Sequence, residues 1–306
     1  MGVRTPRGAL HGVLLLDKPL GWTSNDALQK AKGLLRAEKG GHTGTLDPLA
    51  TGLLPLCFGA ATKFSQASLD ADKRYIATLR LGQRTSTGDA EGPVLEEREI
   101  AGVDRAAIDA ACLRLTGTLE QRPPMFSALK HQGRALYEYA RAGVEIERPT
   151  RSVVIHHIRV LDWQAATLVI DVACSKGTYI RTLAEDIGSA LGCGAHLSAL
   201  RRTGCGALGV DRAIRIDQLE ALEEPARQAL LLPADVLLAT WPEVQLTAVE
   251  AARFTNGLRR RVAGSDAPAI RVYSTTPRAF LGTAHISAGE LIPSRLLSPT
   301  ELQATA

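Results

Sequence analysis

The chain contains Gly41-His-Thr-Gly-Thr-Leu-Asp-Pro-Leu-Ala-Thr-Gly52, a run of twelve residues with three glycines and one proline. Glycine allows backbone conformations closed to other residues, and Pro48 biases Asp47 toward an extended conformation. Residues 40–52 are therefore predicted to form a loop that holds Asp47 on a rigid turn. Such a carboxylate, with His42 five residues earlier, could act as a nucleophile or general base. A structural turn, in which Asp47 only accepts bonds from neighbouring amides, is the alternative.

Regular elements are predicted on both sides of this loop. Residues 12–16 predict a short buried strand that ends at the turn Asp17-Lys18-Pro19, and a helix capped by Thr23 or Ser24 follows. Further strands are predicted at 75–81, 153–160, 166–173, 269–273 and 280–284, and further helices at 104–116 and 178–191. The irregular alternation and the hairpin-length separations predict an α+β fold with a mixed, largely antiparallel sheet flanked by helices.

Two domains are predicted, because the composition shifts near Pro233–Trp241. Residues 1–240 would form the larger domain and residues 241–306 a small β-rich one. Between the predicted helix and strands of the larger domain, residues 122–151 hold six cations against three acids, with aromatics interleaved. Such a segment can follow a phosphate backbone and offer faces on which bases stack, although a solvated insertion of ordinary charge is the alternative.

Composition sets weaker limits on function. The net charge of +4 on 306 residues permits a polyanionic partner without requiring one. Five scattered cysteines, an odd number, and an apolar run at Val13–Leu16 far too short to span a membrane predict a cytoplasmic protein with reduced thiols. Cys193, His196 and Cys205 are the best zinc candidates, but no C-x-x-C pair accompanies them, and no metal is expected.

The twelve-residue run resembles the central motif of TruB-type pseudouridine synthases, enzymes that isomerise the uridine at position 55 in the T loop of tRNA. Further blocks resemble the same family, of bacterial type, in the same order from about residue 11 to residue 210. These blocks are Leu16–Pro19 with Gly21–Ser24, Lys73–Tyr75, Thr87–Gly92, Gln121–Lys130, Gly133–Tyr137, Cys174–Leu183, Gly194–His196 and Leu200–Arg202.

The resemblance implies a pseudouridine synthase fold with a small C-terminal domain related to the PUA module, which contacts tRNA. It implies Asp47 as the catalytic carboxylate, Tyr75 against the flipped uracil, and Arg181 paired with Asp47. Tyr179 and Leu200 would complete the pocket, and His42 would help to hold everted nucleotides. The RNA-contacting residues it implies are Lys18, Arg122, Phe126, Lys130, Arg134, Arg141, Lys176 and Arg202.

The implied activity is isomerisation without a cofactor, on the T stem-loop of tRNA, by a monomer with no protein partner. After base flipping, Asp47 would drive cleavage of the C1′–N1 bond, uracil would rotate, and C5 would bond to C1′. The residues leave acylal, glycal and base-addition routes open. A tRNA-folding chaperone and a two-carboxylate glycosidase using Asp47 and Asp89 are the competing functions. Beyond residue 240 the match is looser, and Arg259–Arg261 would contact phosphates or lie on a solvated turn.

Overall fold

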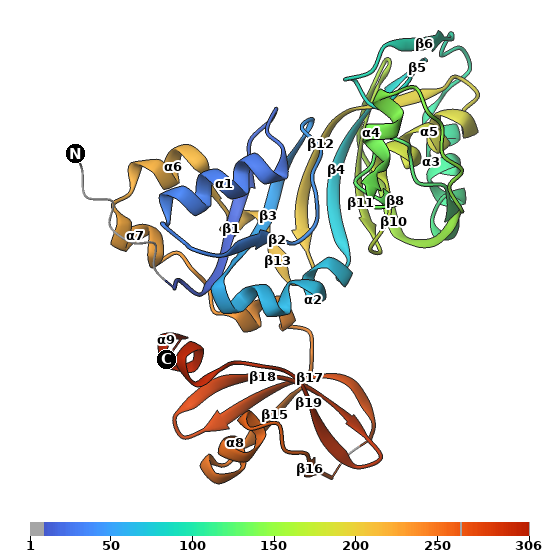
Figure 1. Cartoon of the computed structure of the whole chain (residues 1–306). Coiled ribbons are helices and arrows are strands. Elements are labelled where there is room, and N and C mark those ends of the chain that lie inside the picture. The colour runs from blue at the N-terminus through green and yellow to red at the C-terminus, as the bar shows by residue number, and fades with distance from the viewer. Residues whose placement is uncertain (1–8, 264, 306) are drawn as a thin grey trace, which may run out of the picture.

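The structure, a computed structural model, describes residues 9–263 and 265–305. A ten-stranded sheet with helices packed on it forms the larger part of the molecule, and the last part of the chain forms a separate five-stranded sheet (Figure 1). The predicted α+β class, with a small β-rich C-terminal part, is therefore confirmed.

The large sheet is mixed but largely antiparallel, as predicted. Its strands are β1 (Gly12–Lys18), β2 (Gly40–His42), β3 (Ala50–Phe58), β4 (Lys73–Leu81), β7 (Gly117–Gln121), β10 (Arg151–Gln164), β11 (Thr167–Cys174), β12 (Ala195–Cys205), β13 (Leu208–Gly209) and β14 (Ile214–Arg215). They lie in the order β14-β1-β3-β12-β4-β11-β10-β7, with β2 beside β3 and β13 beside β12. Only the pairs β1–β14 and β3–β12 are parallel among these described strands.

Four helices cover one face of this sheet: α1 (Ser24–Leu34), α3 (Arg105–Arg114), α5 (Ile180–Ala190) and α6 (Ile216–Ala221). Helices α1 and α6 lie over one end and α3 and α5 over the other, with β12 and β4 between (Figure 1). Thr23 caps α1 in a capping box with Asp26, which confirms the predicted cap, and Asp104 caps α3.

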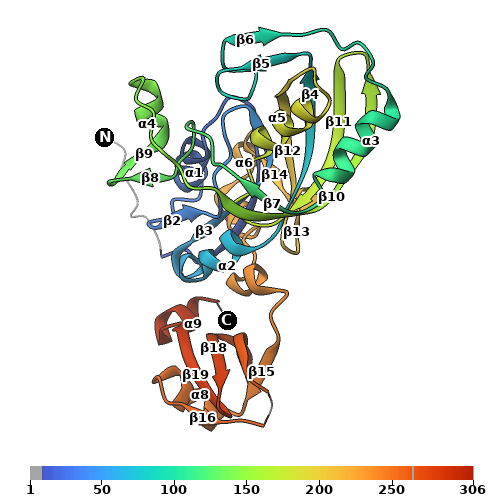
Figure 2. The same cartoon turned by 90° about the vertical axis from the view of Figure 1, so that its right-hand side faces the viewer.

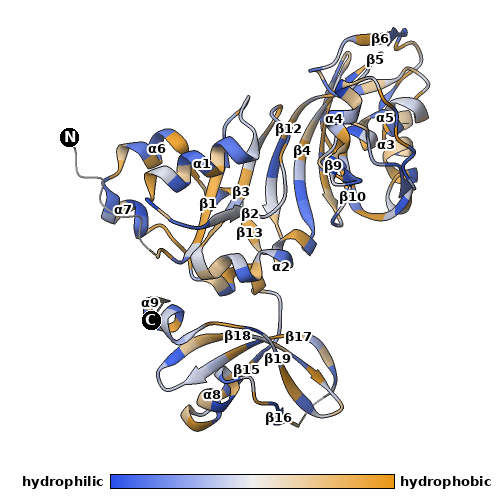
Figure 3. Cartoon of the chain, viewed as in Figure 1, coloured by the Kyte–Doolittle hydropathy of each residue, from blue (hydrophilic) through white to orange (hydrophobic). Residues whose placement is uncertain are grey.

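On the opposite face, a second apolar cluster packs against β1, β3 and the ends of β12 and β13. Short helices η1 (Gly59–Phe64), α2 (Ser65–Asp70) and η3 (Ala234–Leu238) lie there, and Val13 and Leu15 point into the cluster. Leu14 and Leu16 point to the helix-covered face. Because β1 is buried on both faces, its central part is hydrophobic throughout (Figure 3). Smaller elements are β5 (Gln83–Thr85), β6 (Val94–Glu97), η2 (Val210–Arg212) and α7 (Glu224–Gln228).

Several predicted boundaries are wrong. Residues 40–52 are not one loop, because β2 occupies Gly40–His42 and β3 begins at Ala50. Strand β1 continues through Lys18, which pairs with Gly52, so no turn begins at Asp17. The helix predicted at 178–191 begins at Ile180. Strand β12, in the middle of the sheet, was not predicted as a strand.

The basic segment 122–151 is partly ordered into regular elements. It contains a hairpin of β8 (Lys130–His131) and β9 (Arg134–Ala135), followed by helix α4 (Leu136–Arg141). Figure 2 shows these elements projecting to the left of the large sheet. We call residues 122–151 the insertion.

The second sheet has the order β15-β17-β18-β19-β16. Its elements are β15 (Glu243–Leu246), α8 (Ala248–Thr255), β16 (Arg260–Arg261), β17 (Ala267–Thr275), β18 (Arg278–Ser287), β19 (Glu290–Leu296) and α9 (Pro299–Thr305). It meets the larger part at a junction where the rings of Phe64 and Phe280 lie 5.1 Å apart, edge to face. Lys63 Nζ lies 2.5 Å from Glu301 at the same junction. In the described parts of the chain, no helix is both long and apolar enough to cross a membrane.

Candidate active site

Asp47 lies on the irregular segment between β2 and β3, and this segment is fixed from both sides. The hydroxyl of Ser24, at the start of α1, donates to the Leu46 carbonyl at 3.0 Å and accepts from the Leu46 N–H at 2.8 Å. The Gly21 N–H donates to the Pro48 carbonyl at 2.9 Å. The two residues that flank Asp47 are therefore both held by Gly21 and Ser24, at and just before the start of α1, which gives the block Gly21–Ser24 a physical role.

Arg181, on α5, joins Asp47 to a second carboxylate. Its guanidinium lies 2.9 Å from Asp47 and 3.5 Å from Asp89. It also donates to the backbone carbonyls of Thr87 at 3.1 Å and Phe126 at 2.6 Å. Arg181 is 5% exposed, whereas 41% of the Asp47 side chain is open to solvent. Asp89 is buried and cannot reach a sugar, which argues against the two-carboxylate glycosidase.

The ionisation of Asp47 reflects opposing influences. Burial raises the pKa of Asp47 above its ordinary value, and the Asp89 carboxylate raises it further. The Arg181 guanidinium lowers this pKa by charge and by hydrogen bonding, and Lys18 lowers it by charge. The ion pair with Arg181 thus counteracts a site that disfavours the charged carboxylate.

The helix-covered face of the sheet brings the other predicted pocket residues near this loop. Leu200 on β12 pairs with Ala50 on β3 and with Ala77 on β4. Paired residues on neighbouring strands point to the same face, so Tyr75, two residues before Ala77, lies on this face as well. Asp47 is tied to Ala50 by a backbone hydrogen bond of 3.0 Å. Tyr75 is buried, and burial raises its pKa to about 12, so its ring is neutral.

Two predicted RNA contacts need correction, because both side chains are interior. Arg202 is 1% exposed and donates to the carbonyls of Leu53 at 2.7 Å and Gly44 at 3.3 Å. Lys18 is fully buried and donates to the carbonyls of Pro19 at 3.0 Å and Trp22 at 2.5 Å. Burial lowers the Lys18 pKa to about 8. Both cations stabilise the backbone around the Asp47 loop instead of facing solvent.

His42 and Tyr179 approach the site from different elements. Burial lowers the pKa of His42, which favours the neutral imidazole, and its buried Nδ1 has no hydrogen-bond partner among the described residues. Tyr179 is the residue before α5, and its backbone is hydrogen-bonded to Gln121. The guanidinium of Arg151 lies over its ring, 4.8 Å from the centroid.

The remaining predicted RNA contacts lie at the surface, except for one. Arg122, Lys130, Arg134, Arg141 and Lys176 are exposed, and Phe126 is half-buried. Three of these cations already have partners: Arg134 pairs with Glu138, Lys176 pairs with Asp70, and Arg141 lies over the Tyr137 ring. In the C-terminal part, Arg260 pairs with Glu250 at 2.7 Å and Arg259 lies 3.6 Å from Glu290, so these arginines are not simply solvated.

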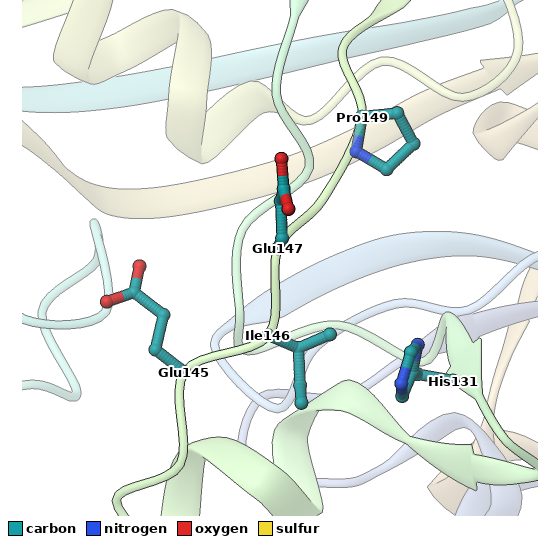
Figure 4. A pocket seen from close by; sticks show the side chains of 5 residues that line it. All are labelled: His131, Glu145, Ile146, Glu147 and Pro149. Carbon is teal, nitrogen blue, oxygen red and sulfur yellow. The ribbon is translucent and has the colours of Figure 1, made fainter.

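A hollow in the insertion contains none of the predicted site residues. It has a volume of about 480 Å³ and is lined by His131, Glu145, Ile146, Glu147 and Pro149 (Figure 4). Two carboxylates at its wall would repel phosphate, so the hollow does not mark the path of an RNA backbone.

The described residues include no group of three or more His, Cys, Asp and Glu side chains arranged to hold a metal ion. His196 Nδ1 lies 3.2 Å from the Gln83 carbonyl and Cys205 lies against Ser68, so each has a partner within the fold. Sequence reasoning missed Asp89 as a partner of Arg181, and it missed Gln121 and Arg151 beside Tyr179. Asp89 and Gln121 do stand inside blocks that resemble the family, which was the signal available.

Family models cover most of the chain. Residues 32–180 match the TruB family pseudouridylate synthase N-terminal domain, and residues 181–239 match the tRNA pseudouridylate synthase B C-terminal domain. Residues 242–297 match the C-terminal model of pseudouridine synthase II TruB.

Curated relatives and solved structures agree with these models. The tRNA pseudouridine synthase B of Cupriavidus pinatubonensis is 58% identical over 96% of both chains. That of Verminephrobacter eiseniae is 57% identical over 98% of this chain and 92% of its own. A Cbf5–Nop10–Gar1 complex contains a chain 26% identical, with a TM-score of 0.73, over 95% of this chain and 86% of that one. An archaeal box H/ACA sRNP Nop10–Cbf5 complex shares the fold at 22% identity and a TM-score of 0.73, over 96% and 88% of the two chains.

A clamped carboxylate beside a buried arginine, in a chain that matches these models and relatives along nearly its whole length, leads to one assignment. The chain belongs to the TruB family of pseudouridylate synthases and is an isomerase that converts uridine to pseudouridine in tRNA.

Proposed function

We propose that this enzyme modifies the uridine at position 55 in the T loop of tRNA, acting as a monomer on the T stem-loop, with Asp47 as the catalytic carboxylate. The observation that carries the proposal is the setting of Asp47. Its neighbours on both sides are hydrogen-bonded to Ser24 and Gly21, its carboxylate is paired with buried Arg181, and 41% of its side chain remains open to solvent. This combination presents a fixed, charged group to a substrate.

The target uridine must leave its stack before a side chain can reach C1′. Eversion costs a few kcal/mol, and stacking on an aromatic ring offsets about 1–3 kcal/mol of it. Tyr75 supplies such a ring on the helix-covered face, and Leu200 lies on the same face one strand pair away. Tyr179 closes the pocket beside α5. His42, on β2, supplies a neutral imidazole that helps to hold an everted nucleotide.

The chemical step conserves the atoms of the substrate. The C1′–N1 bond breaks, uracil rotates within the closed pocket, and the C1′–C5 bond forms, while the proton on C5 is lost and N1 gains one. Ionised Asp47 can bond to C1′, stabilise positive charge there, or accept the 2′ proton. Each role requires the charged carboxylate, and the Arg181 ion pair favours that form.

The exposed cations of the insertion and Lys176 supply the proposed contacts to phosphates. Arg122 and Lys130 flank the Phe126 turn, whose carbonyl is bound by Arg181, and Arg134 and Arg141 follow on β9 and α4. We further propose that residues 1–240 form the catalytic domain and that residues 241–306 form a PUA-like domain that contacts tRNA outside the T loop.

The test is conversion of an unmodified tRNA transcript by Asp47→Asn, with pseudouridine mapped by mass spectrometry and chemical labelling. We expect wild type to modify one uridine, in the T loop, and the variant to bind tRNA normally without forming product. Asp109→Asn, on the exposed surface of α3, is the matched control and should be fully active. Product from Asp47→Asn would refute the catalytic assignment, and product at another position would refute the proposed target.

A further inference from the structure

The two ends of the insertion meet directly beside the proposed uracil pocket. Gln121 is the last residue of β7 and Arg151 is the first residue of β10, and the two are partners in the antiparallel ladder. A movement of the insertion when it binds RNA would therefore be transmitted to the sheet through Gln121 and Arg151. Both side chains reach the same third residue, Tyr179.

Gln121 holds the backbone of Tyr179 on both of its polar groups. The Tyr179 N–H donates to Gln121 Oε1 at 2.7 Å, and Gln121 Nε2 donates to the Tyr179 carbonyl at 3.1 Å. Gln121 is buried, so water does not compete for these bonds. A side-chain amide that hydrogen-bonds both the N–H and the carbonyl of one residue fixes the backbone of that residue, and with it the direction in which its side chain points.

Arg151 holds the side chain of Tyr179. Its guanidinium lies 4.8 Å from the ring centroid and donates to the Gly177 carbonyl. Gly177 has φ +83°, a backbone conformation that other residues rarely adopt, and a Cβ there would be in van der Waals contact with the guanidinium, 3.4 Å from its carbon. The flat guanidinium thus lies between the Gly177 backbone and the Tyr179 ring.

A second connection runs from the insertion to the catalytic carboxylate. Arg181 donates to the Phe126 carbonyl, inside the insertion, and pairs with Asp47 through the same Nη2 atom. The insertion therefore contacts two residues at the start of α5: Arg151 lies over the Tyr179 ring, and the Phe126 carbonyl accepts from Arg181.

We propose that Gln121 and Arg151 are positioning residues for the isomerisation: they set the Tyr179 ring against the uracil when the insertion engages RNA. This inference rests on the proposed role of Tyr179. A positioning residue acts on the rate of the bound complex, since a displacement of about 1 Å in a reacting group can cost about 100-fold. It has little effect on affinity, which the exposed cations govern.

The experiment is a double-mutant cycle between Arg151→Met and Tyr179→Leu, read as the single-turnover rate of pseudouridine formation and, separately, as the Kd for tRNA. We expect Arg151→Met to lower the rate by about 10- to 100-fold and to change Kd by less than about two-fold. In the Tyr179→Leu background, the same substitution should cost less than about two-fold, because the group through which Arg151 acts is already gone.

Three further variants complete the test. Arg148→Met is the matched control: Arg148 is also well covered, but it donates to the Ile146 and Pro123 carbonyls and contacts no site residue that the structure describes. It should retain the wild-type rate. Arg151→Lys keeps the charge without the flat face and should be intermediate. Gln121→Leu should resemble Arg151→Met.

The outcomes separate this inference from the proposed function. Absence of T-loop pseudouridine with wild-type enzyme would refute the proposed function. Active wild type with additive losses in the Arg151–Tyr179 cycle, or an equal loss in Arg148→Met, would refute the positioning role alone. Melting temperatures of all variants show whether a lower rate reflects loss of folded enzyme. If all variants are folded, a rate for Arg151→Lys above that of Arg151→Met supports the positioning role.

Discussion

Asp47 is held between groups that move its pKa in opposite directions. Burial and Asp89 raise the pKa, whereas Arg181 and Lys18 lower it. Because the reaction needs the ionised carboxylate, the acid limb of the pH–rate profile should report this balance.

We expect Arg181→Gln to move the acid limb of the single-turnover pH–rate profile to higher pH, since a group that lowers the Asp47 pKa is lost. Asp89→Asn should move the acid limb to lower pH, because it removes a negative charge that raises the Asp47 pKa. Asp47 then remains as the carboxylate partner of Arg181. The two substitutions remove opposite charges from one ion pair and so control for each other. Shifts in the same direction would contradict this electrostatic account.

The same pKa shift has a consequence for stability. A carboxyl group whose pKa is raised by folding contributes stability that is present below its unfolded pKa, near 3.8, and is lost as pH rises through the folded value. From the direction of this shift, the charged form of Asp47 is expected to oppose folding at pH 7. We expect Asp47→Asn to melt at a temperature no lower than wild type at pH 7, with any advantage shrinking toward pH 4. Arg181 keeps Asp89 and two carbonyls in this variant. Calorimetry across this range measures the effect, and a large loss of stability at pH 7 would oppose it.

At the scale of elements, the parallel contact between β3 and β12 depends on Gly52. Gly52 has φ +98°, and a Cβ there would overlap the backbone of Arg202. We expect Gly52→Ala to lower the free energy of unfolding by about 2 kcal/mol or more and to abolish activity. Gly41→Ala is the control, because a Cβ at Gly41 meets no described atom within 4 Å. Urea denaturation of both variants would show the difference, and equal stability would argue against the close approach.

The insertion is the element on which affinity should depend. Arg122→Gln and Arg141→Gln should each weaken tRNA binding and reduce the slope of log K against log salt by about one. Arg105→Gln, an exposed cation on α3 paired with Asp109, serves as the control and should leave the slope unchanged. Binding titrations at several salt concentrations give these slopes. An unchanged slope in Arg122→Gln and Arg141→Gln would contradict the proposal that the insertion contacts phosphates.

Elements with strong local signals could be predicted from the sequence. The capped helix after Thr23 and the alternating strand around Tyr75 were predicted because their patterns are local. Strand β12 was missed, since Arg201, Arg202 and Gly204 obscure its apolar alternation. Arg202 is tolerated inside the sheet only because carbonyls of two distant segments accept its hydrogen bonds. Such compensation depends on the assembled fold and leaves no local pattern.

The candidate site shows the same division. The pairing of Arg181 with Asp47 was anticipated from the family resemblance, and the structure contains it at 2.9 Å. The bridge onward to Asp89, and the hold of Gln121 and Arg151 on Tyr179, join residues far apart in the sequence. Arg202 and Lys18 were predicted to contact RNA because the family resemblance implied it, whereas both side chains are interior. Both side chains are stabilised in the interior by backbone carbonyls that accept their hydrogen bonds, and the sequence alone does not reveal which carbonyls are available.

At the scale of the whole molecule, specific contacts join the two sheets at their junction. Phe280 packs on Phe64, and Tyr273 donates to Asp235 at 2.6 Å. We propose that the C-terminal part contacts tRNA outside the T loop. In that case Phe280→Ala should lower kcat/KM on full-length tRNA about five- to ten-fold, because it loosens the link between the two parts that contact the substrate. An isolated T stem-loop should be modified at the wild-type rate. Comparing kcat/KM on the two substrates tests this, and equal losses on both would contradict it.

The central place of β12 also governs when the enzyme becomes competent during its own synthesis. Strands β3 and β4 leave the ribosome early, yet the strand that joins them ends only at Cys205. Until β12 is made, the edges of β3 and β4 that it will join have no partner strand. Pairing between segments so far apart in the sequence is slow, and an unpaired strand edge can associate with the wrong strand. When β12 arrives, it closes both edges at once and brings the Asp47 loop and the Tyr75 wall together. A nascent polypeptide therefore carries Asp47 and Tyr75 long before it can act on RNA.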